Sequence, residues 1–173
     1  LADIYRVFTK INIKTTKDTG LHVNIGFYNQ QELDLIKLVL LASDNEDLKD
    51  YNRLTNIHCQ SQLDHLLKSP YSENKFRALE RILANQYVEF YHLINSNKYM
   101  EINIIKWTET IEGYMPLIEF RALGGENYFS SKYEQTIQYI QKYCALMALA
   151  ADPDLYKSQY FERIQTIQSR LKL

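Results

Sequence analysis

Apolar and polar positions repeat with two different periods along this chain, and the periods predict where helices and strands alternate. Apolar residues at helical spacing predict helices at 1–10, 29–42, 54–68 and 74–96, from Ser131 onward and after Asp152, with a short helix or loop at 44–51. Alternating positions predict strands at 11–15, 21–27, 99–107 and 116–123. This order predicts an α+β fold in which helices back a mainly antiparallel sheet.

Local signals refine this prediction. A turn at 17–20, with Gly20 at positive φ, is expected to join the first two strands into a hairpin. Capping boxes are expected at Asn29 with Glu32 and at Ser131 with Glu134. The helix after Ser131 is expected to bury a stripe of Ile137, Ile140, Cys144 and Met147, and that after residue 54 to bury Ile57, Leu63, Leu66 and Leu67.

Composition narrows the class of protein. At 173 residues the chain suits a single domain, 1–173, with a sizeable core. A net charge of -1 indicates no nucleic-acid partner, and no apolar run is long enough to span a bilayer. Cys59 and Cys144 fit reduced core thiols better than a disulfide, which favours an intracellular setting. The 14 tyrosines suit half-buried surfaces and slightly favour an interaction surface.

Two predicted strands carry polar residues on one face only. Successive strand side chains point to opposite faces, so His22 and Asn24 share a face, and Glu119 shares one with Arg121. The two pairs together would form the floor of a polar site. Taken singly, each has a plainer explanation: His22 as a hydrogen-bonded structural histidine and Glu119–Arg121 as a surface ion pair. Gly124-Gly125 is interpreted as a turn rather than a phosphate cradle.

The motifs T-G-L-H-V-N at 19–24 and I-E-F-R-A-L-G-G at 118–125 resemble the amidoligase family. These are carboxylate–amine ligases of the glutamine-synthetase-like superfamily, many of them encoded by bacteriophages. The resemblance extends to D-x-x-K-L-x-L-L at 34–41, N-R-x-x-N at 52–56, a strand carrying Asn103, and the two closing helices. It covers most of the chain and implies a glutamine-synthetase-like fold, of which this chain is the C-terminal portion.

The resemblance also implies a chemistry. ATP phosphorylates a carboxylate, and an amine then attacks the acyl phosphate, with Mg²⁺ between phosphates and carboxylate. The substrates would be a small-molecule or peptide carboxylate and an amine. By motif, Glu119 would bind Mg²⁺, Arg121 would hold the carboxylate or the transferring phosphate, and His22 would contact substrate. Asn24 stands where glutamine synthetases carry a second histidine near the nucleotide phosphates, and Arg53 and Asn103 are further binding candidates.

One departure keeps a second hypothesis open. The superfamily's other acidic metal ligands lie on an early G-x-E-x-E strand, upstream of every motif seen here. A domain without that strand would keep the fold and act as a structural or assembly module among other protein subunits, for example inside a phage particle rather than free in the cytoplasm. A third hypothesis rests on Arg53 to His58, whose R-x-x-x-x-H spacing resembles the all-helical HEPN ribonucleases.

Overall fold

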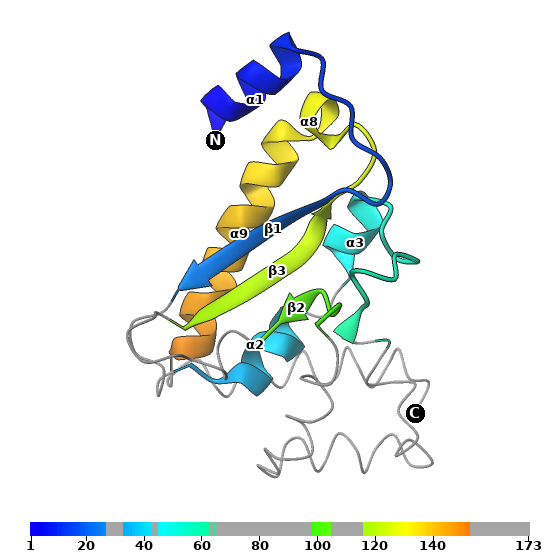
Figure 1. Cartoon of the computed structure of the whole chain (residues 1–173). Coiled ribbons are helices and arrows are strands. Elements are labelled where there is room, and N and C mark those ends of the chain that lie inside the picture. Colours follow the sequence, from blue (N-terminus) through cyan, green and yellow to red (C-terminus); the bar gives the residue numbers. More distant parts are fainter. Residues whose placement is uncertain (27–32, 43–44, 63, 65–97, 105–115, 153–173) are drawn as a thin grey trace.

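A computed structural model describes residues 1–26, 33–42, 45–62, 64, 98–104 and 116–152. Within these ranges helices and strands are mixed, as the α+β prediction required (Figure 1). The helices are α1 (Ala2–Lys10), α2 (Leu35–Ala42), α3 (Glu46–Asp50), α8 (Tyr128–Ser131) and α9 (Tyr133–Ala151). The strands are β1 (Gly20–Gly26), β2 (Ile102–Asn103) and β3 (Leu117–Gly124). They form one antiparallel sheet in the order β1-β3-β2.

A bulge in β3 sets which side chains reach each face of the sheet. Val23 pairs with Phe120 and Leu21 with Leu123, so two steps along β1 match three along β3. The extra residue lets Phe120 and Leu123 both face the core despite their odd spacing. Arg121 and Ala122 consequently stand together opposite His22.

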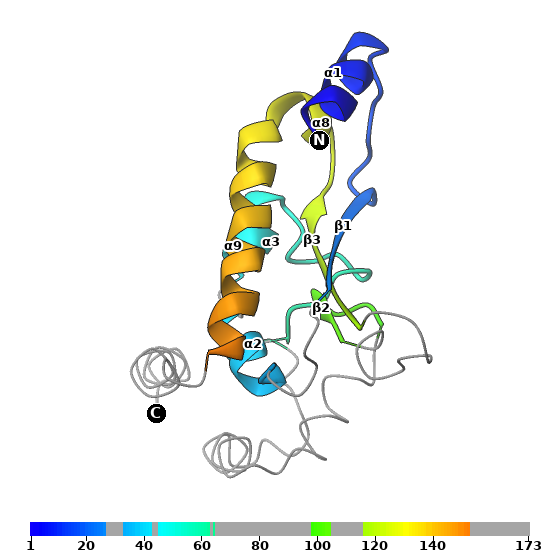
Figure 2. The ribbon, with the colours of Figure 1, turned by 90° about the vertical axis from the view of Figure 1, so that its left-hand side faces the viewer.

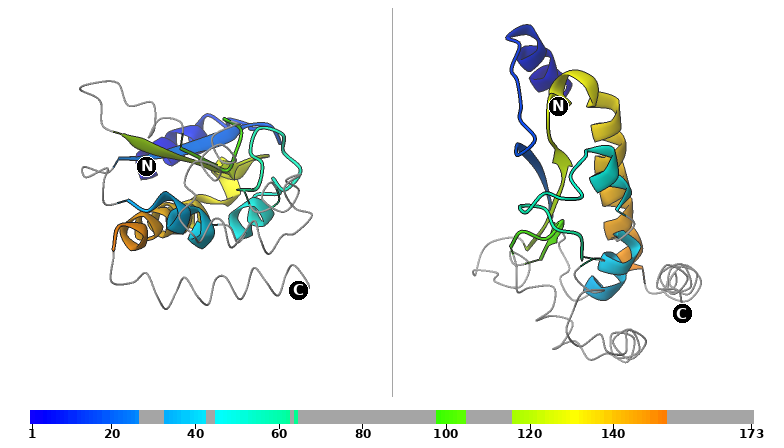
Figure 3. Two further views of the ribbon diagram at one scale, coloured as in Figure 1. Left: turned by 90° about the horizontal axis from the view of Figure 1, so that it is seen from below. Right: turned by 90° about the vertical axis from the view of Figure 1, so that its right-hand side faces the viewer.

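Helices cover one face of this sheet. Figures 2 and 3 show α9 running along the sheet, with α2 and α3 in the same layer. Phe120 of β3 stacks on Tyr143 of α9, with ring centroids 4.2 Å apart and planes inclined by 9°. Burial of large aromatic rings on both sides makes this contact a centre of the core. The polar residues of β1 and β3 therefore lie on the opposite face.

The buried stripe of α9 differs from the predicted one. Cys144 is exposed, whereas Tyr139 and Tyr143 are buried together with Met147. Hydropathy alone underrates tyrosine, which can be buried when its hydroxyl finds a partner. Here Tyr139 and Tyr143 donate to Asp50 and Asp47 of α3, at 2.6 and 2.7 Å. Both cysteines are free, and only Cys59 is a core thiol.

The predicted N-terminal hairpin is wrong. Residues 11–15 form no strand: Asn12 takes a left-handed φ of 53°, and Ile11 is 62% exposed. The turn before β1 is confirmed, since the Thr19 N–H donates to the Thr16 carbonyl at 3.0 Å. Gly20 does not take positive φ and instead begins β1. The neighbour of β1 is β3, whose long apolar face offers it more burial than the short segment 11–15.

Several predicted helix boundaries also need correction. Helix α2 begins after Asp34, whose carboxylate accepts from the Lys37 N–H at 2.9 Å as an N-cap does. Ser131 ends α8, and α9 starts without a side-chain cap. Residues 54–60 are turns rather than a helix, and Ile57 is 69% exposed. The short helix near 44–51 is confirmed as α3.

Other predictions lie outside the described residues. They are the start of the helix at 29–32, the buried stripe beyond residue 62, the helix at 74–96, the strand and turn over 105–115, and the closing helix after Asp152.

Candidate functional site

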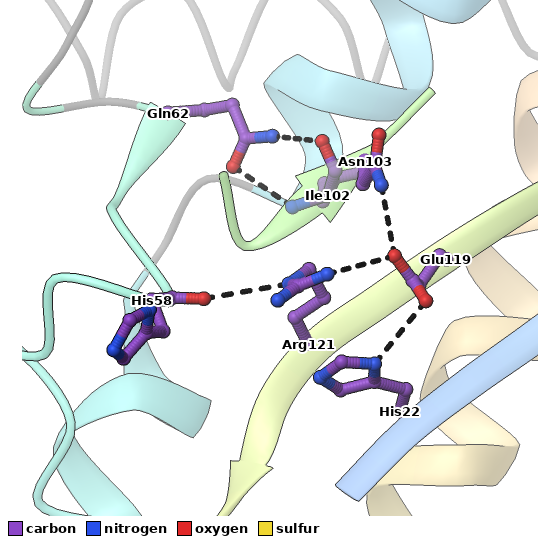
Figure 4. Close-up of polar contacts among 7 residues, drawn as sticks. All are labelled: His22, His58, Gln62, Ile102, Asn103, Glu119 and Arg121. Carbon is purple, nitrogen blue, oxygen red and sulfur yellow. Dashed lines mark hydrogen bonds and ion pairs between the residues drawn. The ribbon is translucent and has the colours of Figure 1, made fainter. Parts of the chain in front are cut away.

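Glu119 occupies the centre of the polar face of the sheet. It lies on the middle strand, so it has a cross-strand neighbour on each side: Asn24 on β1 and Asn103 on β2. Arg121 follows two residues later on the same face, and His22 lies one pleat from Asn24. Residues spread from 22 to 121 thus converge on one carboxylate (Figure 4).

Both oxygens of the Glu119 carboxylate are engaged. Oε2 accepts from Asn103 Nδ2 at 2.8 Å and from Arg121 Nη1 at 3.0 Å, and Oε1 lies 3.2 Å from His22 Nδ1. Only 6% of the Glu119 side-chain surface is exposed. A carboxylate at this depth needs such charge-assisted partners, since an unpaired one would be expelled or protonated.

His22 is the more accessible member, with 38% of its side chain exposed. Desolvation lowers its pKa below the ordinary 6.5, the nearby Arg121 guanidinium lowers it further, and Glu119 acts in the opposite direction. At neutral pH the ring is therefore uncharged. Because a carboxylate only accepts, Nδ1 must carry the proton, which leaves Nε2 as an acceptor. Such a nitrogen could take a proton from an incoming amine.

Arg121 is fixed on several sides. Besides Glu119, its Nε donates to the His58 carbonyl at 3.4 Å, and its guanidinium carbon lies 5.9 Å from the centroid of the Tyr99 ring. Tyr99 in turn meets the His58 ring edge-on, at 5.2 Å between centroids. The bulge after Phe120 places Arg121 opposite His22, and bulges commonly direct side chains into sites. A guanidinium held in this way suits a carboxylate or phosphate ligand.

Arg53 differs from the other predicted site residues because it is only 2% exposed. Its Nη1 donates to the Thr19 carbonyl at 2.7 Å, which ties the turn before β1 in place. Its Nε is buried without a hydrogen-bond partner among the described residues. A Cβ added to Gly20 would lie 3.2 Å from His22 Nε2 and 3.6 Å from Arg53 Nη2, so both groups approach that glycine. Arg53 therefore supports the turn beside the site.

The chain from Arg53 to His58 is a series of turns, with Arg53 buried and His58 exposed. This is not the all-helical setting that the HEPN ribonuclease hypothesis requires.

Two polar residues that support the site were missed. Glu101 alternates with Asn103 as Glu119 does with Arg121, and its carbonyl accepts from the Arg121 N–H at 2.8 Å. This alternation in the sequence could have identified Glu101 as a residue on the same face of the strand as Asn103. The Gln62 side-chain amide accepts from the Ile102 N–H at 3.1 Å and donates to the Ile102 carbonyl (Figure 4). It thus satisfies backbone groups of β2 as a neighbouring strand would. No sequence pattern indicates Gln62.

Glu119 supplies a donor oxygen that Mg²⁺ could share with a nucleotide. Carboxylate oxygen is a ligand that Mg²⁺ prefers, and a cation reaching Oε1 of Glu119 would replace the His22 contact. Within the described ranges, no three His, Cys, Asp or Glu side chains are grouped to hold a metal. One carboxylate plus nucleotide phosphate oxygens is an ordinary Mg²⁺ environment.

Comparisons with known protein families, curated proteins and solved structures find no match to this chain. In the part of the chain that the structure describes, no helix has the length and apolar character needed to cross a membrane.

Proposed function

We propose that this domain is an ATP- and Mg²⁺-dependent ligase that joins a carboxylate to an amine through an acyl phosphate. One observation supports the proposal most: Glu119 is contacted by His22, Asn103 and Arg121, and the ligase resemblance singles out all four residues. Asn24 stands beside them across the strand pair.

The proposed chemistry has two steps. A substrate carboxylate oxygen attacks the γ-phosphorus of ATP, the bond to the bridging oxygen breaks, and ADP leaves. The amine nitrogen then attacks the acyl carbon, phosphate leaves with its bond to that carbon broken, and the amine loses a proton. Arg121 would hold the anionic carboxylate or transferring phosphoryl group, and neutral His22 would accept the proton at Nε2.

Mg²⁺, when bound, would neutralise charge on the nucleotide phosphates. Glu119 would hold it, with Asn24 close by on β1. Because the described residues group no three His, Cys, Asp or Glu side chains that could hold a metal, the proposal predicts that Mg²⁺ binds tightly only when ADP or a non-hydrolysable ATP analogue is present. Isothermal titration with Mg²⁺ alone, and then with the nucleotide, measures this dependence.

A specific observation favours the alternative of an assembly module without catalysis. Protein groups contact both oxygens of the Glu119 carboxylate, as expected of a cluster that holds three strands together. In that case the geometry of the cluster would serve stability, and the partners would be other protein subunits, for example in a phage particle.

ADP release separates the two functions. The protein would be incubated with ATP, Mg²⁺ and a panel of carboxylates and amines. The ligase predicts ADP release that needs both substrates and is lost in Glu119→Gln and Arg121→Ala. Exposed residues provide matched controls, Glu126→Gln and Arg6→Ala, which should keep full activity. Full activity in a folded Arg121→Ala variant would contradict the assigned role, and no ADP release with any pair would favour the assembly module.

A further inference from the structure

Helix α1 presents an apolar surface to solvent. Large hydrophobic side chains are half exposed along it: Ile4 at 50%, Val7 at 53% and Ile11, just after it, at 62%. Their spacing of three and four residues places them on one stripe of the helix. Exposed apolar residues scattered singly are ordinary, but a continuous stripe marks an interaction surface.

The same helix already packs on the domain through another side, so the exposed stripe is a second apolar surface of α1. Tyr5 is buried, and its ring meets those of Phe129 and Tyr133 at 5.2 and 4.7 Å between centroids. Phe8 meets Phe129 at 4.7 Å. The helix is therefore held in place by α8 and the start of α9 while its second apolar side remains uncovered. Figures 1 and 2 show α1 at the end of the molecule occupied by α8, away from α2.

The charges beside the stripe indicate what would cover it. Asp3 and Lys10 are two helical turns apart, so both border Val7 on the same edge. The acidic residue stands near the start of the helix and the basic one at its end. A second α1 running antiparallel would bring the opposite charges together at both ends, whereas a parallel one would set like charges side by side.

The exposed Asp3–Arg6 contact does not oppose this pairing. Asp3 Oδ1 and Arg6 Nη1 lie 3.1 Å apart, and 87% of the Asp3 side chain and 78% of the Arg6 side chain are exposed. Exposed ion pairs of this kind contribute little to stability. Asp3 can therefore exchange partners at little cost.

We infer that α1 is a self-association surface: two copies of this chain pair through antiparallel α1 helices. Ile4 of each copy packs beside Val7 of the other, and Asp3 of each faces Lys10 of the other. The contact is isologous, as a twofold dimer requires. One nine-residue helix from each copy gives an interface below the usual size for stable complexes, so the dimer is weak and depends on concentration. The site around Glu119 plays no part in it.

Charge reversal tests the pairing. Sedimentation equilibrium from about 10 μM to about 1 mM should show a monomer–dimer equilibrium for the native chain, within the range of weak complexes. Asp3→Lys and Lys10→Asp should each raise the dissociation constant about tenfold, because two symmetry-related pairs become repulsive. An equimolar mixture of the two variants should restore association, since each pair across the mixed dimer is again of opposite charge.

Two further variants separate apolar packing from charge. Val7→Lys should abolish association, whereas Ile57→Lys, at a 69% exposed position outside α1, should leave it unchanged. Circular dichroism verifies that each variant is folded. A native chain that stays monomeric throughout the concentration range would overturn the inference. So would a dimer that tolerates Val7→Lys, or a variant mixture that associates no better than its components.

Discussion

Replacing Glu119 by leucine tests the polar cluster most severely. The change keeps a side chain of similar volume but removes the acceptor of the Arg121 and Asn103 hydrogen bonds. Arg121 has only 12% of its side chain exposed, so its charge would be left largely desolvated without this partner. Breaking one side of a buried ion pair costs about 3–5 kcal/mol. Two hydrogen bonds to a charged acceptor, at about 1.5–3 kcal/mol each, give a similar figure.

Urea unfolding at pH 7 measures this loss. We expect Glu119→Leu to lower the free energy of unfolding by about 3–5 kcal/mol, a large share of the roughly 5–15 kcal/mol of an ordinary domain. Glu119→Gln keeps one oxygen for Arg121 and Asn103 and should lose less. Adding Arg121→Met to Glu119→Leu should recover part of the stability, because no unpaired charge then remains.

The control is Glu126→Gln, at an exposed turn, which should change stability by less than about 0.5 kcal/mol. A Glu119→Leu variant within about 1 kcal/mol of the native chain would refute the reasoning, since the cluster would then contribute no net stability.

Three further predictions concern other parts of the fold. NMR titration should place the His22 pKa below 6.5, and this pKa should rise in Arg121→Ala and fall further in Glu119→Gln. A lowered pKa in the folded state means that the unfolded chain binds more protons at about pH 6. The free energy of unfolding should therefore fall as pH drops below about 6.5, and it should fall less steeply in His22→Gln. Gly124→Ala should lower the free energy of unfolding by more than about 2 kcal/mol, because φ is 119° and the new Cβ would lie 2.5 Å from the Thr19 carbonyl oxygen. Gly20→Ala, at a position without positive φ, should lower it less. Equal losses in the two variants would contradict this reasoning. Tyr143→Phe should cost about 1–3 kcal/mol in thermal or urea unfolding, because buried Asp47 loses a donor at 2.7 Å, and an unchanged midpoint would count against that.

The polar face could be predicted from the sequence because strand alternation is a local rule. His22 with Asn24, and Glu119 with Arg121, needed only the period of two to be placed on common faces. Their meeting at one carboxylate required the pairing of β1 with β3, which is a long-range choice. The sequence favoured a local hairpin through residues 11–15, and the structure pairs β1 elsewhere.

The predictions failed where tertiary partners decide burial. The tyrosines of α9 enter the core because α3 supplies carboxylates for their hydroxyls, and no helical period contains that information. Apolar residues at helical spacing predicted the helix at 1–10, yet Ile4 and Val7 of α1 are half exposed while Tyr5 is buried. A period locates an apolar stripe but not the surface that covers it.

Isotope transfer tests the central claim most directly. The chain would be incubated with ATP, Mg²⁺, an amine and carboxylates labelled with ¹⁸O, and the released phosphate would be analysed by mass spectrometry. Ligation through an acyl phosphate moves one carboxylate oxygen into phosphate, so we predict ¹⁸O-phosphate formed by the native chain and none by a folded Arg121→Ala variant. Phosphate that stays unlabelled while ATP is consumed, or ATP left intact with every carboxylate and amine, would contradict the account.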